Sequence, residues 1–366
     1  MRISGNEFQG KEVGEMCKLI VISLWVIGCL LFHGDFAFSV DQESQAVQSA
    51  KKEGKVVLWT SGWTPTMAKQ IGESFKKRYG LHDLQFTYAA TRTAEIIAKV
   101  TQELKVNRLS VDIISGGIPE FYYELLRADE IMKYDSPEYR FFPMVEGTCA
   151  EPGYWVSSTA FSPTAIMWNP KYVKKDITSY KDLLDPQLKG MVCSLDARKS
   201  DSGLSGYFGL RKILEKEFFV QLARQDIFWL SRTPDIANRV ATGERPVAFM
   251  GSNRSTFDVA MSGIEVKLIY PKEGVVVLSM PFVPLAKAPH PHATQLLIDY
   301  LHSAEGQKII SDVGYFIGRK GVPLSPKVAK YIPPLSDIRV IPVDWKSVDK
   351  QKMDGMRKEF IEIFGK

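Results

Sequence analysis

The sequence predicts an α/β protein of two lobes arranged as a clamshell. The chain of 366 residues is long enough for two domains. A unit of short apolar strand, small-residue loop and helix recurs along it, which indicates mostly parallel sheets with helices on both faces. Two extended stretches, at about 140–165 and at 275–287, interrupt these units. We expect them to be the hinge strands that connect the lobes.

The N-terminal 39 residues are predicted to be a signal peptide. Leu19–Phe32 is an apolar run that is too short to span a bilayer and is typical of the core of such a peptide. Small residues at Ala37 and Ser39 favour cleavage after Ser39, which would give a periplasmic or extracellular protein. Two alternatives stay open. The stretch VIGC resembles a lipobox that would attach a lipid to Cys29, and translation could start at Met16.

Composition and charge exclude several classes of protein. The chain is 45% hydrophobic and 24% charged, which is typical of a globular protein rather than a disordered one. Its net charge of +5 is scattered, and no basic run is dense enough to favour nucleic acid. Cys149 and Cys193 could form a disulfide in an oxidising compartment, but we favour two buried small side chains. No spacing of Cys and His resembles a zinc site.

Three strand–loop–helix units follow one another in the first part of the chain. Their strands are predicted at 55–60, 84–88 and 111–114. In the first unit, Thr64 is a good N-cap and Gly80 ends the helix. The loops of all three units leave the carboxyl ends of parallel strands. Open α/β sheets bind their ligands at that edge.

The same pattern resumes in the second half of the chain. Strands are predicted at 190–195, 247–250 and 264–270, and helices from about Gly203 and from Thr233 to Gly243. Three C-terminal helices are predicted at 293–303, 304–313 and 349–364. We expect the first lobe to comprise 40–160 plus 276–366, and the second lobe to comprise 161–275.

Five stretches in this order resemble the extracellular solute-binding proteins of ABC importers, of the type that includes the ferric-iron-binding proteins. They are KKEGKVVLWTS, SYKDLLDPQLKGMV, ATGERPVAFM, KAPHPHATQLLIDYLHSAEGQKIISDVGYFIGR and VIPVDWKSV. The resemblance covers nearly all of residues 45–366. It implies a periplasmic binding protein type 2 fold that closes around a ligand held between its lobes. It also implies delivery of a solute to the membrane subunits of a permease; we expect a monomer without a cofactor.

The ligands of the iron-binding members are not found at the matching positions. Those proteins place a His in the first loop, a Glu in the third, and a pair of Tyr after a strand of the second lobe. This sequence has Trp63, Gly116, and Asn253 with Arg254 at those places. Because an Arg repels a trivalent cation, iron is not the expected ligand. Iron held by tyrosines elsewhere stays an alternative, with candidates at Tyr88, Tyr122 and Tyr207.

Arg254 is the residue that we expect to bind an anionic ligand. It follows the apolar strand VAFM, so it should lie at the carboxyl end of that strand and face the cleft. Its planar guanidinium suits a carboxylate, a phosphate ester or a sulfonate, and Arg92 could clamp the same anion from the first lobe. Helix starts would add hydroxyl and free N–H groups. The predicted ligand-binding residues, with no metal ligand among them, are Ser61, Gly62, Trp63, Thr91, Arg92, Ser115, Gly116, Ser200, Ser202, Gly203, Asn253 and Arg254.

Structural roles compete with these functional ones. Arg92 could pair with Glu95 instead, and Ser or Thr at a helix start is most often an ordinary cap. Trp155 could line the cleft beside Trp63 or pack in the core. His290 and His292 resemble a metal pair, but a turn before the next helix explains them better.

Two other classes of function remain open. An enzyme on this fold would need a nucleophile with a base, yet the His residues of the mature chain lie outside the predicted cleft loops. We therefore do not expect an enzyme. A sensor partner that presents its ligand to a receptor cannot be separated from a transport protein by sequence. A polyamine or thiamine ligand would require acidic cleft residues, for which Asp112 and Asp258 are the candidates.

Overall fold

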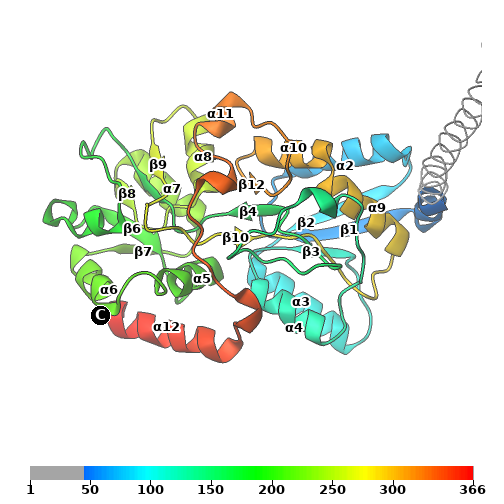
Figure 1. Ribbon diagram of the computed structural model, residues 1–366, viewed down its shortest axis with the longest axis horizontal. Coiled ribbons are helices and arrows are strands. Elements are labelled where there is room, and N and C mark those ends of the chain that lie inside the picture. The colour runs from blue at the N-terminus through cyan, green and yellow to red at the C-terminus, as the bar shows by residue number, and fades with distance from the viewer. Residues whose placement is uncertain (1–44, 366) are drawn as a thin grey trace, which may run out of the picture.

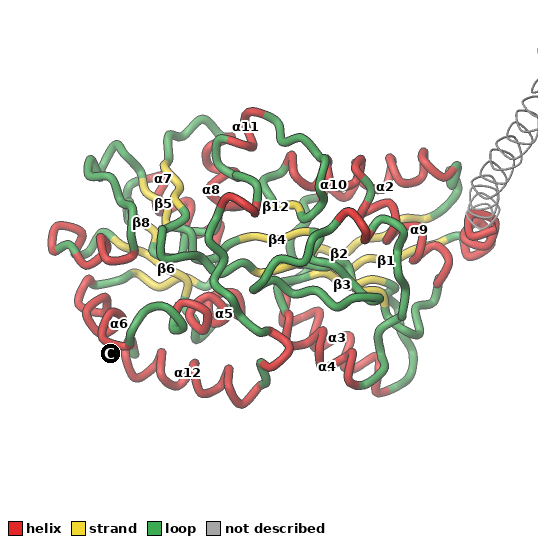
Figure 2. The backbone as a smooth tube through the Cα atoms, viewed as in Figure 1, coloured by secondary structure: helices red, strands yellow, loops and turns green. Residues whose placement is uncertain are grey.

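The computed structural model describes residues 45–365, which form two lobes lying side by side (Figure 1). The strands run as a central band through both lobes, and helices lie on either side of it (Figure 2). The two-lobed α/β architecture predicted from the sequence is therefore confirmed. The expected signal peptide and its alternatives at Cys29 and Met16 lie outside the described residues. Between residues 45 and 365, no helix is both long and apolar enough to cross a membrane.

The first lobe is built on a four-stranded sheet of order β11-β3-β1-β2. Strands β1 (Lys55–Thr60), β2 (Gln85–Ala90) and β3 (Ile113–Ser115) are parallel, and β11 (Val283–Pro284) is antiparallel to β3. The helices of this lobe are α2 (Pro65–Tyr79), α3 (Thr93–Lys105), α4 (Pro119–Arg127), α9 (Pro291–His302) and α10 (Ala304–Asp312). Because β1, β2 and β3 are parallel, the loops that follow them leave the same edge of the sheet, as the sequence predicts.

Local signals define the first helix as expected. The Thr64 hydroxyl accepts a hydrogen bond from the backbone N–H of Met67, and Pro65 occupies the first helical position. Gly80 ends the helix in the left-handed conformation, with a φ of 62°. The cap at Thr64 fixes where α2 begins and so fixes the loop 61–63 at the sheet edge, whereas Gly80 fixes where α2 ends.

The second lobe is built on a five-stranded sheet of order β7-β6-β8-β5-β9. Its strands are β5 (Ile166–Trp168), β6 (Val192–Leu195), β7 (Phe228–Leu230), β8 (Val247–Ala248) and β9 (Lys267–Ile269). Its helices are α5 (Asp201–Leu210), α6 (Lys216–Leu222), α7 (Thr233–Thr242) and α8 (Asn253–Met261). Strand β5 runs antiparallel to both β8 and β9, so this sheet is mixed.

A small sheet of order β10-β4-β12 connects the lobes. The two predicted crossings supply β4 (Thr159–Phe161) and β10 (Leu278–Ser279), which pair antiparallel. A third segment, β12 (Phe316–Ile317), pairs with the other side of β4. Chain from three distant parts of the sequence therefore meets between the lobes.

The C-terminal helix α12 (Lys350–Phe364) packs on the second lobe, below α5 and α6 in Figure 1. The carboxylate of Glu359 accepts hydrogen bonds from the Tyr207 hydroxyl at 2.6 Å and from Arg211 Nε at 2.8 Å. Phe360 is buried against the rings of Tyr207 and Trp229. By contrast, α9 and α10 pack on α2. We therefore propose that α12 belongs to the second lobe, and not to the first as residues 276–366 were expected to.

Shorter elements complete the described chain. They are helix α11 (Pro326–Ala329) and the 3₁₀ turns at Tyr139–Phe141, Tyr180–Leu184, Pro186–Leu188, Ala223–Gln225, Leu335–Asp337 and Trp345–Ser347. Cys149 and Cys193 are both fully buried and both free, and burial raises the pKa of each thiol to about 12. They therefore pack as small apolar side chains.

Candidate functional site

Arg254 lies at the start of α8, directly after the turn that follows β8. Ser252, which caps this helix, has a φ of 48°, an unusual value for a residue other than glycine. The Arg254 side chain is only 13% exposed. Its Nη1 forms a close ion pair with the carboxylate of Asp258, whose own side chain is 62% exposed, and its Nε is buried without a hydrogen-bond partner among the described residues. The guanidinium is thus buried with its Nε donor left unused.

Tyr315 joins Arg254 to the first lobe. The guanidinium carbon of Arg254 lies 5.4 Å from the centre of the Tyr315 ring, a cation–π arrangement. The Tyr315 hydroxyl donates a 2.6 Å hydrogen bond to the carbonyl of Gly62 in the loop after β1. Burial raises the pKa of Tyr315, and the charge of Arg254 opposes that rise. Sequence reasoning missed Tyr315; its one signal was its place in the family-like stretch DVGYFIGR.

Gly62 is required by this close approach. A Cβ added to it would lie 2.4 Å from the Tyr315 hydroxyl oxygen and 2.7 Å from Cε of Met280. Its neighbour Trp63, predicted to form an aromatic wall of the cleft, is instead buried at 5% exposure, with its ring edge-on to Phe282 at 5.8 Å. The structure therefore places Gly62 beside Tyr315, whose ring contacts Arg254, and it places Trp63 in the core of the first lobe.

The loops after β1 and β3 lie together at the edge of the first-lobe sheet. The backbone N–H of Ser61 donates to the carbonyl of Ser115 at 3.1 Å, and the Ser61 hydroxyl lies 3.1 Å from where a Cβ on Gly116 would be. The hydroxyl of Ser115 is buried and donates to the carbonyl of Met280 at 3.2 Å. The Gly116 carbonyl accepts a 2.9 Å bond from Tyr122. Of these predicted residues, Ser61 keeps a side chain without a committed partner within residues 45–365.

Arg92 and Thr91 have the structural role that competed with their functional one. The Arg92 side chain is 83% exposed, and its Nη2 lies 2.7 Å from the Glu95 carboxylate. The hydroxyl of Thr91 bonds to the same carboxylate. Both bonds lower the pKa of Glu95, and the bond from Thr91 contributes most. The described contacts do not bring Arg92 to Arg254, so the clamp of two arginines stays a prediction without support.

Ser200 and Ser202 open α5 in the second lobe. The Ser200 hydroxyl accepts a hydrogen bond from the backbone N–H of Gly203 at 3.1 Å, and the two serine hydroxyls lie 3.2 Å apart. Ser200 is thus an ordinary cap, and Gly203 is the residue that it caps. Asn253 also has a structural role: it is fully buried, and its Oδ1 accepts a 2.7 Å bond from the backbone N–H of Ser162.

Glu120 and Asp201 are charged residues that sequence reasoning missed. Glu120 is the second residue of α4 in the first lobe, and Asp201 is the first residue of α5 in the second. Burial is the main cause that raises the pKa of Glu120 to about 7, and the negative charge of Asp201 adds to it. The Oε2 atom of Glu120 is buried without a hydrogen-bond partner among residues 45–365. Nothing in the local sequence distinguishes it, because Glu in a first helical turn is common.

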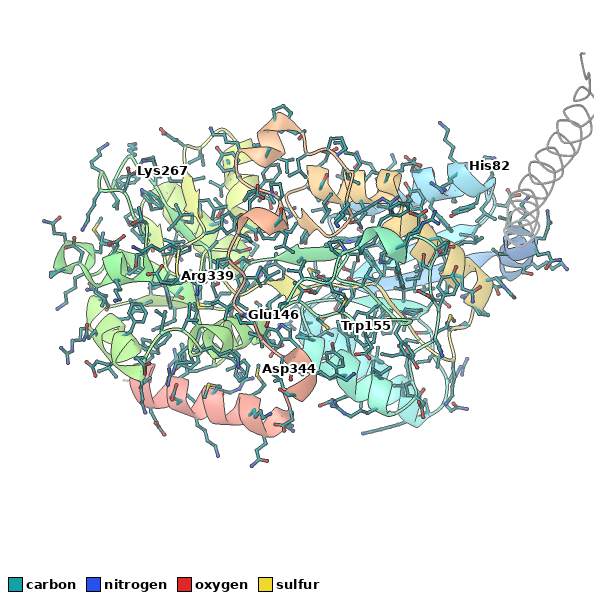
Figure 3. The ribbon with its side chains drawn as sticks, viewed as in Figure 1. His82, Glu146, Trp155, Lys267, Arg339 and Asp344 are labelled. Atoms are coloured by element: carbon teal, nitrogen blue, oxygen red, sulfur yellow. The ribbon has the colours of Figure 1, made fainter. Side chains whose placement is uncertain are left out.

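Other candidates from the sequence are structural. Trp155, labelled in Figure 3, is fully buried in the first lobe against the rings of Tyr122 and Tyr123. The buried carboxylate of Asp112 accepts hydrogen bonds from the backbone N–H groups of Val57 and His290, as a turn before α9 would need. No group of three or more His, Cys, Asp or Glu in the described part of the chain could hold a metal ion.

Comparisons with known proteins agree with this architecture. The chain has a TM-score of 0.70 to the periplasmic binding protein AfuA from Actinobacillus pleuropneumoniae, with fructose-6-phosphate bound; the identity is 17%, over 85% of this chain and 98% of that one. The chain has a TM-score of 0.67 to iron-bound HitA from Pseudomonas aeruginosa; the identity is 18%, over 84% of this chain and 99% of that one. The TM-score to the substrate-binding protein of an ABC transporter from Agrobacterium tumefaciens is 0.69; the identity is 15%, over 85% of this chain and 94% of that one.

Sequence comparison gives the family itself. None of the curated proteins matches the chain. A family model described as "Bacterial extracellular solute-binding protein" matches residues 111–350, which is more than half of the chain. These residues include the third loop of the first lobe, the whole second-lobe sheet and the strands between the lobes. The protein belongs to this family of bacterial extracellular solute-binding proteins.

Proposed function

We propose that this protein captures a small organic anion between its lobes, outside the cytoplasmic membrane, and delivers it to the membrane subunits of an ABC permease. The ligand class is a carboxylate, a phosphate ester or a sulfonate. In this proposal the protein acts as a monomer, uses no cofactor and catalyses no reaction. The membership of the family supports the transport role, and the chemistry around Arg254 supports the ligand class.

The observation that carries the proposal is the unused hydrogen-bonding capacity of Arg254. A buried donor of a charged group that lacks a hydrogen bond is costly, and an anion that accepts from Nε, and from Nη1 in place of Asp258, would remove this cost. A planar guanidinium binds carboxylate or phosphate through two parallel bonds. The competing carboxylate of Asp258 is mostly exposed, so it can turn to solvent when a ligand takes its place on Arg254.

In this proposal Arg254 lies between the lobes, and binding is coupled to closure. Arg254 comes from the second lobe, whereas its ring partner Tyr315 is hydrogen-bonded to Gly62 of the first. An anion that docks on Arg254 would therefore meet the loops 61–62 and 115–116 of the opposite lobe. The solved structure of AfuA contains a phosphate ester, which shows that this fold accommodates such an anion in another protein.

Ferric iron is not favoured by the donor groups of this chain. HitA binds iron, but two of the three candidate tyrosines of this chain have other hydrogen-bond partners. The Tyr122 hydroxyl donates to the Gly116 carbonyl, and the Tyr207 hydroxyl donates to Glu359. Burial raises the pKa of both phenols, which opposes the phenolate form that iron would need.

The test is a thermal-shift screen of organic acids, phosphate esters and sulfonates on residues 40–366, followed by calorimetric titration of the anions that bind. Replacing Arg254 with Ala should weaken binding roughly 10- to 100-fold, the cost of one charge-assisted contact. Arg92→Ala is the matched control, because it removes the same charge at an exposed site, and it should bind as the wild type does. Equal affinity in the Arg254 variant and the wild type would remove Arg254 from the site.

A further inference from the structure

We propose that a cavity beside the small sheet β10-β4-β12 binds a small monocarboxylic acid with an apolar body, and that its occupancy shifts the angle between the lobes. This hinge cavity has a volume of about 330 Å³, at the lower end of the range for ligand pockets. It is lined by residues 143, 145, 315–322, 324 and 332–336. None of the residues predicted to bind the transported solute lines it, so the inference does not rest on the proposed anion site.

The floor of the hinge cavity is apolar. Phe316 of β12, Ile332 and Leu335 line it and belong to one buried hydrophobic cluster. Val322 and Leu324 add half-buried apolar side chains to its walls. Such surfaces favour the hydrocarbon part of a ligand, because the burial of apolar surface releases water.

Both charged residues of the lining are cations, and one of them is unpaired. Arg319 donates to the Glu138 carboxylate at 2.6 Å and to the carbonyl of His302 at 3.0 Å, so it is already committed. Lys320 is exposed at the mouth, and its ammonium has no ion pair or hydrogen bond with any of residues 45–365. No Asp or Glu is among the described residues that line the cavity. One uncompensated positive charge complements a carboxylate, which carries one negative charge, better than a phosphate ester, which carries nearly two at pH 7.

The two walls of the hinge cavity are held by different lobes. On one side, the backbone N–H of Lys320 donates a 3.0 Å hydrogen bond to the carbonyl of Phe141, which packs on the core of the first lobe. The other wall, 332–336, directly follows Tyr331. The carbonyl of Tyr331 accepts a 2.9 Å hydrogen bond from the hydroxyl of Tyr270, next to β9 in the second lobe. A ligand that touches both walls therefore favours one separation between them, which links its binding to the lobe angle.

The experiment titrates the protein with phenylacetate and with its uncharged analogue 2-phenylacetamide by isothermal titration calorimetry. Phenylacetate should bind about 10-fold more tightly than the amide, the effect of one charge-assisted hydrogen bond. Lys320→Gln should remove this difference. Lys327→Gln, the same change at an exposed position of α11 outside the lining, should keep it. Val322→Phe, which fills part of the cavity, should abolish the binding of both probes.

The link to the lobe angle is measured by small-angle X-ray scattering. A saturating concentration of phenylacetate should change the radius of gyration of the wild type, and it should leave that of Val322→Phe unchanged. A wild type that binds the probe with an unchanged radius would refute the link. If thermal denaturation shows that Val322→Phe does not fold, the two lysine variants decide whether the cavity is the site.

The outcomes separate this cavity from the proposed anion site. Arg254→Ala should keep the phenylacetate binding that Lys320→Gln weakens. If Arg254→Ala removes this binding and Lys320→Gln does not, the probe binds at Arg254 and the hinge cavity is refuted as its site. The proposal also fails if neither probe binds the wild type. Equal affinities for the acid and the amide would refute the role of Lys320 and, with it, the carboxylic acid as the occupant.

Discussion

His302 should make the folded protein lose stability in mild acid. It is fully buried at the end of α9, where its ring contacts the rings of Tyr139, Phe142 and Phe282. Its Nδ1 lies 2.7 Å from the carbonyl of Ile298, which can only accept, so Nδ1 carries the proton of the neutral ring. Its Nε2 is buried without a partner among the described residues. Protonation would place an unpaired charge at that nitrogen.

The magnitude follows from the pKa in the folded state. Burial is the main cause that lowers the pKa of His302 from 6.5 to about 4, and the nearby charge of Arg319 contributes. As the pH falls below 6.5, His302 binds a proton in the unfolded chain but stays neutral in the folded protein. Linkage then lowers the free energy of unfolding by about 2 kcal/mol between pH 7.5 and pH 5, and by about 3 kcal/mol near pH 4.

The assay is urea denaturation of the wild type and of His302→Asn at pH 7.5 and at pH 5. Asparagine keeps a donor near the Ile298 carbonyl and does not titrate. The variant should be less stable at pH 7.5, because a smaller side chain leaves a cavity. Its loss of stability between the two pH values should nevertheless be about 2 kcal/mol smaller than that of the wild type. An equal loss in both proteins would refute a neutral, buried His302.

Two further substitutions test the packing. Phe360→Ala should lower the free energy of unfolding by about 3–5 kcal/mol. It should also change the fluorescence of its ring neighbour Trp229 before the first lobe unfolds. A loss below about 1 kcal/mol would contradict the packing of α12 on the second lobe. Gly314→Ala should destabilise more than Gly321→Ala, measured by thermal denaturation. Both glycines have positive φ, but only at Gly314 would the new Cβ collide with the Phe257 ring, at 2.6 Å; equal losses would show that the collision is relieved.

Much of the fold could be predicted because its signals are local. The cap at Thr64 and the stop at Gly80 each depend on a few neighbouring residues, and both are confirmed. Strands β5 and β7 were missed, although β3 and β9 are equally short and were predicted. Strand β5 follows directly on the stretch interpreted as an extended crossing, and β7 is only half-buried, so neither stands out as a separate buried strand. The packing of α12 was also missed. An amphipathic helix shows that it has a buried face but not which lobe covers it.

The candidate site was harder to predict because it depends on long-range contacts. Arg254 could be anticipated from the apolar strand before it and the helix that begins beside it. Tyr315 could not, since its partner Gly62 is 253 residues away in the sequence. The same holds for Glu120, because the burial that raises its pKa cannot be predicted from its place in a first helical turn. Trp63 is of a residue type that often lines ligand pockets, yet its neighbours bury it.

Strand β11 and helix α12 have a consequence for how the polypeptide acquires its structure. The first-lobe sheet is incomplete until β11 has been synthesised, and Tyr207 of the second lobe finds its carboxylate partner 152 residues later. Such distant closures are entropically expensive and slow. Neither lobe can therefore complete these contacts until a late part of the chain has been made, β11 for the first lobe and α12 for the second.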